Sequence, residues 1–465
     1  MVERAGTVHP YIPNSIPEVK AAMLAAIGAK TIDEIYEAIP SHLRLKRLLD
    51  LPPAYASEAA LVRHIESILA RNQTTRENLS FLGAGAYHHY VPAVCDEINS
   101  RSEFLTAYAG QPYEDHGRFQ ALFEYTSMMG DLLDMDVVNV PTYDGYQASA
   151  TSLRMACRIT GRNRVVITST LADDKLQKIR DYLAPHITIE MAPLSEASGE
   201  VDVAALDRLV TDDTAAVYIE TPSYFGVIST FGLQIAEMAH RVGAIFVVSC
   251  DPISLGVLAP PAQYGADIAC GDIQSLGMHV QYGGGQAGYI AVPDDPRFVM
   301  EMPSRLFGLA PTRVEGEYGF GDVAFERTSL ARREESKEWV GTAASLWGIT
   351  AGVYLALLGP QGLVELGEGI MARTQYAMRR LGGIDGVKVM HDSSHHFREF
   401  VLDFGASGQS VASVNSALLQ RGIFGGKDLS TEFPSLGQSA LYCVTEIHSK
   451  DDIDRLASEM EAVLE

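Results

Sequence analysis

The sequence predicts an α/β fold built on a mostly parallel sheet, and two observations carry this prediction. Short, nearly continuous apolar runs recur along the middle of the chain: RVVITS (164–169), AAVYIE (215–220), AIFVVSC (244–250) and GYIAV (288–292). Such β-branched runs are typical of strands buried on both faces of a parallel sheet. Amphipathic segments such as LQIAEMAHRVG (233–243) lie between the runs. Helices on both faces of such a sheet would give a domain of three layers.

Residues 1–75 are expected to form an N-terminal helical arm. The segment IPEVKAAMLAAIG (16–28) has Pro17 in its first turn and a glycine at its end, as helices commonly do. The segment LVRHIESILARN (61–72) is also expected to be helical. Its apolar face consists of Leu61, Ile65, Ile68 and Leu69. An arm with such a face is expected to pack on the main body or on a partner.

The remaining residues divide into a large α/β domain (76–334) and a C-terminal part (335–465). A long helix is expected over 335–358, closing at Gly359-Pro360. After it, helical and strand-like segments alternate, among them EFVLDF, SVASVNSALLQRG, LYCVTE and a final acidic helix. This pattern predicts a small α+β domain.

Composition excludes several classes of function. The formal net charge of −23 opposes binding to nucleic acid, whose phosphates this field would repel. There is neither a run of eighteen apolar residues nor an N-terminal secretion signal, so we expect no membrane span and a cytoplasmic location. The five cysteines form no C-x-x-C pair, and the histidine-rich HDSSHH (391–396) reads as a turn. We therefore expect no metal site.

The carboxyl end of the run 244–250 is the first candidate site, because ligands of α/β sheets gather at strand ends. Asp251 ends this run, and GADIACGDIQSLG (265–277) supplies a second strand and a turn. This layout resembles the cofactor half of a pyridoxal-phosphate (PLP) enzyme of the aminotransferase type. In those enzymes the aspartate pairs with the pyridinium nitrogen, and a lysine on the later turn forms the Schiff base. Asp251 is either such an acid or a structural cap.

The lysine is missing here. The later turn offers Gln274 and Ser275, and no lysine occurs between Lys178 and Lys337. A second candidate is Asp144-Gly145, which would cradle a phosphate at a helix N-terminus or simply cap that helix. The bulky Tyr146 favours capping. The triple glycine 283–285 is read as a flexible turn or a close contact with a partner backbone.

Motifs along the whole chain resemble those of one family. They include IPSHLRLKRLLDLPP (39–53), FLGAGAYHHYVPAV (81–94), MDVVNVPTYDG (135–145), DDTAAVYIETPSYFGVI (212–228), DPISLGVLAPPAQYGADIACGDIQSLG (251–277) and VTEIHSKDDIDRL (444–456). The chain resembles the first (alpha) subunit of the two-subunit glycine decarboxylase, the P-protein of the glycine cleavage system. The resemblance implies the type I fold of PLP-dependent transferases, with a large α/β domain and a small α+β domain.

The resemblance also implies which subunit carries the cofactor and where the active site lies. A sister beta subunit carries PLP, and the working site lies where the two subunits meet; a small amino acid is the substrate, and a lipoyl carrier protein is the expected acceptor. This chain then has no autonomous catalytic residue, Ser275 standing near the place of the lysine. Asp144, Gly145 and Asp251 are the cofactor-proximal candidates. The substrate and interface candidates are Tyr87, His88, His89, Tyr108, Gln111, Pro112, Glu114 and His116.

His89 takes the family histidine position and is the leading functional candidate, with core or hinge packing as the alternative. Three segments depart from the family pattern: AGQPYEDHG (109–117), YDGYQA (143–148) and RREESKEWVGTAA (332–344). Acids and aromatics replace small neutral residues there, which would alter what the site accepts. The expected function is therefore a glycine decarboxylase alpha subunit. The alternatives are a paralogue acting with a beta partner on another amino acid, or a non-catalytic scaffold.

Overall fold

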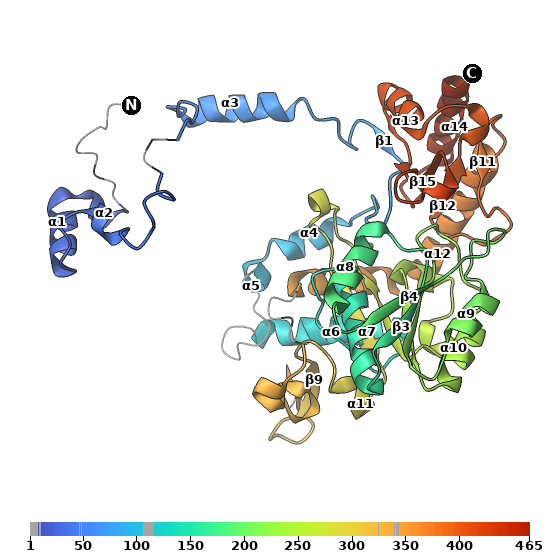
Figure 1. The fold of residues 1–465 in the computed structure, drawn as a ribbon, viewed down its shortest axis with the longest axis horizontal. Helices are drawn as coiled ribbons and strands as arrows, with labels where there is room; N and C mark the ends of the chain where they lie inside the picture. Colours follow the sequence, from blue (N-terminus) through green and yellow to red (C-terminus); the bar gives the residue numbers. More distant parts are fainter. Residues whose placement is uncertain are drawn as a thin grey trace. The chain divides into compact units, whose positions relative to one another are not determined.

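The chain is described from a computed structural model, which covers residues 8, 11–45, 47, 49–105, 116–323, 325–338, 340 and 344–465. It consists of two compact units, residues 1–73 and residues 74–465, and each is described by itself. Figure 1 shows the elements of both.

The described residues of the first unit form helices joined by turns and loops. Its helices are α1 (Pro17–Ala26), α2 (Ile32–Ile35) and α3 (Glu58–Leu69). Ser57 caps α3 by accepting a hydrogen bond from the backbone N–H of Ala60 at 3.3 Å. The four side chains of the predicted apolar face of α3 are between 44% and 56% exposed. No residue described between 8 and 73 is buried, so this unit has no core of its own.

A seven-stranded sheet forms the centre of the second unit. Its strands lie in the order β2-β8-β7-β6-β5-β3-β4. Their bounds are β2 (Val137–Val138), β3 (Arg164–Thr168), β4 (Thr188–Ala192), β5 (Thr214–Glu220), β6 (Ile245–Ser249), β7 (Ile268–Asp272) and β8 (Gly288–Val292). β4, β3, β5, β6 and β7 run parallel, as predicted. β8 is antiparallel to both of its neighbours, β7 and β2, so the run 288–292 is a buried strand of the opposite direction.

Helices cover both faces of this sheet (Figure 1). The helices of the large domain are α4 (Ala93–Asn99), α5 (Ser102–Leu105), α6 (His116–Leu133), α7 (Gly145–Thr160), α8 (Asp173–Leu183), α9 (Val203–Leu209), α10 (Gly232–Arg241) and α11 (Pro296–Val299). Among them, α6 and α10 pack on one face of the sheet, and α7 and α8 pack on the other. Alternate residues of β6 enter different cores, because side chains alternate across a strand. Phe246 and Val248 pack with α6 and α10, whereas Ile245 and Val247 pack with α7 and α8.

The long helix after the large domain differs from the prediction. It is α12 (Ser345–Leu381), so residues 335–338 are not part of it and it does not end at Gly359-Pro360. Gly359 has a φ of 60° and a ψ of −178°, so the backbone kinks there and the helix resumes after Pro360. One window of α12 is apolar enough to pass for a membrane span. This helix packs against the rest of the chain through buried residues such as Ile349 and Leu355, and 39% of that window is buried.

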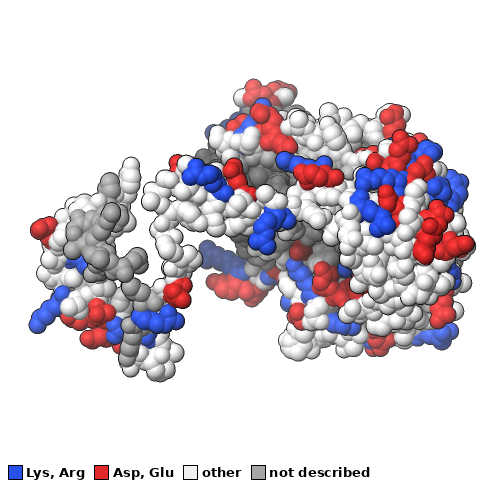
Figure 2. All heavy atoms as spheres, turned by 90° about the horizontal axis from the view of Figure 1, so that it is seen from above, with Lys and Arg blue, Asp and Glu red and all other residues white. Residues whose placement is uncertain are grey.

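The C-terminal part contains a four-stranded antiparallel sheet in the order β11-β12-β15-β14. Its strands are β11 (Lys388–Val389), β12 (Glu399–Asp403), β14 (Lys427–Asp428) and β15 (Ser439–Cys443), and its helices are α13 (Val411–Gln420) and α14 (Lys450–Leu464). β1 (Leu79–Ser80) pairs with β13 (Ile423–Phe424), and β9 (Phe307–Pro311) forms a hairpin with β10 (Tyr318–Asp322). Acidic and basic side chains are interspersed on the face drawn in Figure 2.

Candidate functional site

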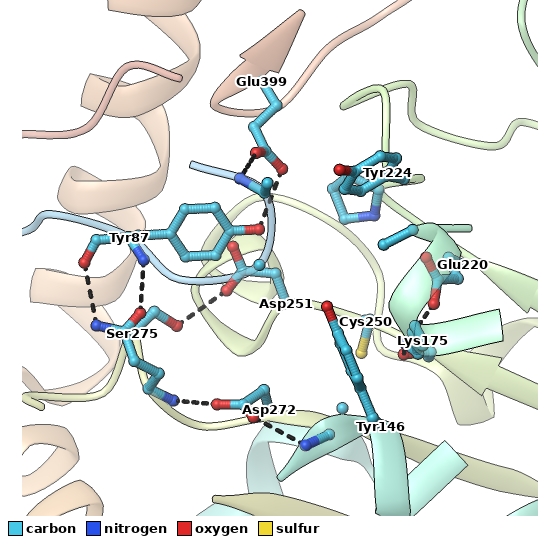
Figure 3. A pocket seen from close by; sticks show the side chains of 18 of the residues that line it. Tyr87, Tyr146, Lys175, Glu220, Tyr224, Cys250, Asp251, Asp272, Ser275 and Glu399 are labelled. Carbon is cyan, nitrogen blue, oxygen red and sulfur yellow. Dashed lines mark hydrogen bonds and ion pairs between the residues drawn. The ribbon is translucent and has the colours of Figure 1, made fainter. Parts of the chain in front are cut away.

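A cavity of about 100 Å³ lies at the carboxyl ends of the parallel strands. Figure 3 shows its principal side chains. They come from segments that are far apart in sequence: Tyr87, Tyr146, Lys175, Glu220, Tyr224, Asp251, Asp272, Ser275 and Glu399. The predicted site residues Tyr87, Gly145, Asp251 and Ser275 are thus brought together around one space. This is where the rule for open α/β sheets places a ligand.

Asp251 lies two residues beyond Ser249, the last residue of β6, and its carboxylate makes three contacts. One carboxylate oxygen, Oδ1, accepts hydrogen bonds from the backbone N–H of Ile253 at 3.0 Å and from the hydroxyl of Ser275 at 3.1 Å. The other, Oδ2, lies 3.0 Å from Nε of Arg398. The first contact caps a short 3₁₀ helix, which fits the structural reading of Asp251. The third gives Asp251 a basic partner that the local sequence does not reveal.

Arg398 is 3% exposed and holds its position through two interactions. Its guanidinium pairs with Asp251 and lies 4.3 Å from the centre of the Tyr87 ring, a cation–π geometry. Its φ of 50° falls in the left-handed region, which costs a non-glycine residue on the order of 1 kcal/mol or more. The surrounding contacts must hold the residue there. Its Nε faces Asp251 as an ion pair, whereas its Nη1 is buried without a hydrogen-bond partner among the described residues.

The turn after β7 anchors the segment that contains Tyr87 and His89. The Gln274 amide accepts from the backbone N–H of Tyr87 at 2.8 Å and donates to its carbonyl at 3.0 Å. The ring nitrogens of His89 lie 2.9 Å from the Met278 carbonyl and 3.1 Å from the Tyr90 carbonyl. Burial lowers the pKa of His89, against the opposing effect of Glu446. A buried ring whose nitrogens both face backbone carbonyls favours the packing interpretation of this histidine.

The other predicted interface residues are placed as follows. His88 is half-buried, and its carbonyl accepts a hydrogen bond from the Thr445 hydroxyl at 2.7 Å. Its pKa is lowered, chiefly by burial. Tyr108, Gln111, Pro112 and Glu114 lie outside the described residues. His116 is the first residue of α6.

Carboxylates occupy the N-terminus of α7. Asp144 caps the helix by accepting from the backbone N–H of Gln147 at 2.6 Å, and it pairs with Lys178 at 2.9 Å. Asp272 accepts from the backbone N–H of Gly145 at 2.8 Å. A Cβ at Gly145 would lie 2.9 Å from Asp272, so this close approach requires glycine. Two of the N–H donors at the start of this helix, those of Gly145 and Gln147, are therefore already bound to protein carboxylates.

The cavity contains a lysine that the sequence analysis did not single out. Lys175 lies in α8, is 8% exposed and forms an ion pair with Glu220 at the end of β5. Its Nζ is also 5.7 Å from the centre of the Tyr146 ring. Burial lowers the pKa of Lys175, but the charge and hydrogen bond of Glu220, together with Tyr218 and Cys270, outweigh burial, and the pKa stands well above its ordinary value. Lys175 is therefore a protonated ion-pair partner and a poor nucleophile at neutral pH.

Two further carboxyl groups of the cavity are unusual. Glu399, 4% exposed, accepts hydrogen bonds from the backbone N–H of Ala84 at 2.5 Å and from the Tyr87 hydroxyl at 3.1 Å. Asp272 accepts from the backbone N–H groups of Gly145 and Gln274, both at 2.8 Å. Burial raises the pKa of each carboxyl to about 7. Neither of them forms an ion pair among the residues that the structure describes.

The fold implies PLP, and the residues of this cavity do not fit it. The acid that would face the pyridinium nitrogen is paired with Arg398, and Ser275 stands where the lysine would be. Carboxylates occupy the phosphate position at α7. No cluster of metal-binding side chains is found in the part of the chain that the structure describes. The chain thus has the fold of a type I PLP-dependent transferase, with an ion-paired acid and a serine at the positions that would hold the cofactor.

Comparison with known proteins identifies the family. The profile of the "Glycine cleavage system P-protein" family matches residues 9–460. The chain therefore belongs to the glycine cleavage system P-protein family. It is 38% identical to "Probable glycine dehydrogenase (decarboxylating) subunit 1" of Staphylothermus marinus, covering 98% of each chain. It is 35% identical to the protein of the same name in Lysinibacillus sphaericus, covering 98% of this chain and 99% of that one.

Solved structures agree with the fold. The crystal structure of glycine decarboxylase (P-protein) of the glycine cleavage system, in an inhibitor-bound form, has a TM-score of 0.83 and 31% identity. The match covers 98% of this chain and 100% of that chain. The sphingosine-1-phosphate lyase of Burkholderia pseudomallei has a TM-score of 0.64 at 13% identity, over 90% of this chain and 93% of that chain. This second match concerns the fold alone.

Proposed function

We propose that this chain is the first subunit of a two-subunit glycine dehydrogenase (decarboxylating) of the glycine cleavage system. Its full-length relatives bear that name, and they support this interpretation rather than a paralogue acting on another amino acid. The PLP of the complex is carried by the second subunit. When bound there, PLP serves as the electron sink for decarboxylation of glycine. The remaining aminomethyl group passes to a lipoyl carrier protein.

The observation that carries the assignment of PLP to the second subunit is the occupied cofactor region of this chain. Asp251 is neutralised internally by Arg398 and hydrogen-bonded by Ser275. Releasing Asp251 for a pyridinium nitrogen would leave the guanidinium buried and unpaired, which is strongly unfavourable. The chain thus supports the neighbouring active site as a structural and positioning subunit.

The helical arm, residues 1–73, supports the pairing with a second subunit. Its described side chains are all at least partly exposed, and the apolar face of α3 meets no core within the arm. Exposed apolar faces of this kind mark interaction sites, because removing apolar surface from water is favourable. We infer that the arm packs against the second subunit.

The test is reconstitution. Each subunit is purified alone, and glycine-dependent exchange of CO2 is measured with a lipoyl carrier for each subunit and for the mixture. We expect exchange only in the mixture. Full activity of the second subunit alone would contradict the proposal and would leave this chain a scaffold. Exchange with another amino acid in place of glycine would contradict the substrate assignment.

A further inference from the structure

A second, smaller cavity of about 20 Å³ lies beside the main cavity. The walls of the two cavities share Glu220 and Ser223. The polar side chains that line the smaller one are four hydroxyls and two carboxylates, those of Thr168, Thr170, Ser223, Ser229, Glu200 and Glu220. Its described lining contains no lysine, arginine or histidine. We call it the hydroxyl cavity, because every polar side chain of its wall presents oxygen.

Three of these hydroxyls lack a hydrogen-bond partner. The Oγ1 atom of Thr168 and the Oγ atoms of Ser223 and Ser229 are buried and have no partner among the described residues. Thr168 is the last residue of β3, whereas Ser223 and Ser229 lie in the connection after β5. All three residues line the hydroxyl cavity. Buried polar groups are nearly always satisfied, so three unpartnered hydroxyls around one cavity indicate a guest that they share.

The volume of the hydroxyl cavity limits the size of this guest. Roughly 10–15 Å³ of such space is needed to hold one water molecule, so a cavity of about 20 Å³ admits a single guest of that size. An organic ligand of several heavy atoms is too large. The guest is therefore either a water molecule or a monatomic ion.

The charges around the hydroxyl cavity distinguish these two guests. Glu220 is paired with Lys175. Glu200 accepts hydrogen bonds from the backbone N–H of Thr230 at 2.7 Å and from its hydroxyl at 3.0 Å, and it forms no ion pair among the described residues. Two carboxylates and one ammonium group thus leave a single negative charge. A cation with one positive charge neutralises it, whereas a water molecule does not.

We propose that the hydroxyl cavity binds one alkali-metal cation, such as potassium or sodium. Hard cations prefer oxygen ligands, and hydroxyls and carboxylates are the only polar side chains in the described wall. Thr168, Ser223 and Ser229 supply neutral oxygens, and Glu200 supplies the balancing charge. A divalent ion would exceed that charge, and no group of three metal-binding His, Cys, Asp or Glu side chains occurs among the described residues.

The position of the hydroxyl cavity indicates what a bound cation does. The connection 221–230 contacts the small domain through its backbone: Ile228 donates to the carbonyl of His395, and Phe397 donates to the carbonyl of Gly226, both at 2.9 Å. A cation held by hydroxyls of this connection and of β3 fastens the connection to the central sheet. It thereby stabilises the junction between the sheet and the small domain. The site lies within this chain and rests on neither the second subunit nor its PLP.

The experiment is thermal unfolding of the purified full-length chain in potassium, sodium or tetramethylammonium chloride. Tetramethylammonium keeps the ionic strength constant and is too large for a cavity that admits one water-sized guest. We expect potassium or sodium to raise the midpoint saturably, by on the order of 2 °C. Identical midpoints in the three salts would show that the cavity holds water only and would overturn the proposal. A rise that never saturates would be a general salt effect and would also overturn it.

Two variants remove hydroxyl ligands without removing a hydrogen bond of the chain. Thr168→Val and Ser223→Ala each lose an unpartnered hydroxyl, so neither should lower the midpoint in tetramethylammonium chloride. Each should raise the half-saturating concentration of the stabilising cation by about tenfold. Ser416→Ala, at an exposed position of α13, is the control and should keep the full response. An unchanged response in either hydroxyl variant that folds would contradict the assigned ligands.

A third variant tests the charge. Glu200→Gln keeps the size of the side chain and removes its negative charge, so the half-saturating concentration should rise at least about tenfold. Glu196→Gln, at an exposed position four residues earlier, is the matched control and should change it by less than about twofold. Equal changes in the two variants would reduce the effect to the general negative charge of the protein and contradict the cation site.

Discussion

The guanidinium of Arg398 lies 3.0 Å from the carboxylate of Asp251. This contact joins the small domain to the central sheet. Arg398 directly precedes β12, and Asp251 lies two residues beyond the end of β6. The pair thus satisfies internally the acid that a PLP enzyme would present to its cofactor. This relationship links the fold of the chain to its role beside a second subunit.

The Arg398–Asp251 pair should behave as a coupled unit in unfolding experiments. Removing one partner leaves an uncompensated buried charge, so Arg398→Gln should lower the free energy of unfolding by about 3–5 kcal/mol. Adding Asp251→Asn to that variant should recover a large part of the loss. Urea unfolding of both single variants and the double variant gives the coupling energy directly. Strictly additive losses would show that the two groups do not compensate one another.

The pKa of Glu399, raised by burial from 4.5 to about 7, predicts a dependence of stability on pH. The folded chain keeps this proton up to about pH 7, whereas the unfolded chain releases it near pH 4.5, so Glu399 lowers stability as pH rises through that interval. Arg398, Tyr87 and Asp251 also act on this carboxyl group. Glu399→Gln does not titrate, so its stability relative to the natural chain should rise from pH 4.5 to 7.5 by on the order of 3 kcal/mol.

Urea unfolding at several pH values measures this difference. Glu368→Gln, at an exposed position of α12, is the matched control and should show a flat difference over the same range. A difference for Glu399→Gln that is flat, or that falls as pH rises, would contradict the raised pKa.

Gly145 is predicted to be intolerant of a side chain. The added Cβ of Gly145→Ala would lie 2.9 Å from the backbone N of Asp272, and steric strain of this kind costs about 1–3 kcal/mol. Gly321→Ala in β10 is the control, because no atom lies within 4 Å of its added Cβ. Thermal unfolding should show a lower midpoint for Gly145→Ala only. Equal midpoints in the two variants would mean that the start of α7 can move away from Asp272.

The apolar face of α3 is predicted to contribute to association with the second subunit. Ile65→Glu combined with Ile68→Glu should weaken association by at least about tenfold, because both side chains are exposed in the isolated arm and available for burial. Ser67→Glu adds charge to the opposite side of the helix and should have little effect. Titration of one subunit with the other reads out the affinity. Equal weakening by all the substitutions would point to charge rather than to an apolar contact.

Much of the large domain could be predicted from the sequence because its signal is local. Runs such as 244–250 are apolar and β-branched throughout, and β6 forms there as a strand buried on both faces. Hydrophobic periodicity carries no information on strand direction. The sequence therefore could not show that β8 runs opposite to the parallel strands. The start of α12 at Ser345 was also mispredicted, and Gly359-Pro360 bends this helix instead of ending it.

The site was harder to predict because its contacts are not local. Asp251 and Ser275 are recognisable from the strand that each follows, but Arg398 and Lys175 reach the same space only through the folded chain. One sequence feature could have indicated these buried contacts, namely the adjacent charged residues Arg398 and Glu399 at the start of a buried strand. Charged residues there require partners, and the structure supplies one through Asp251.

The most direct test of the central claim is chemical trapping of PLP. The reconstituted complex and this chain alone are each treated with PLP and then with borohydride, and the reduced cofactor is located by peptide mapping. We predict reduced PLP on a lysine of the second subunit in the complex, and none at any lysine of this chain, Lys175 included. Specific labelling of Lys175, the lysine that lines the cavity, would contradict the claim that this chain leaves the cofactor to its partner.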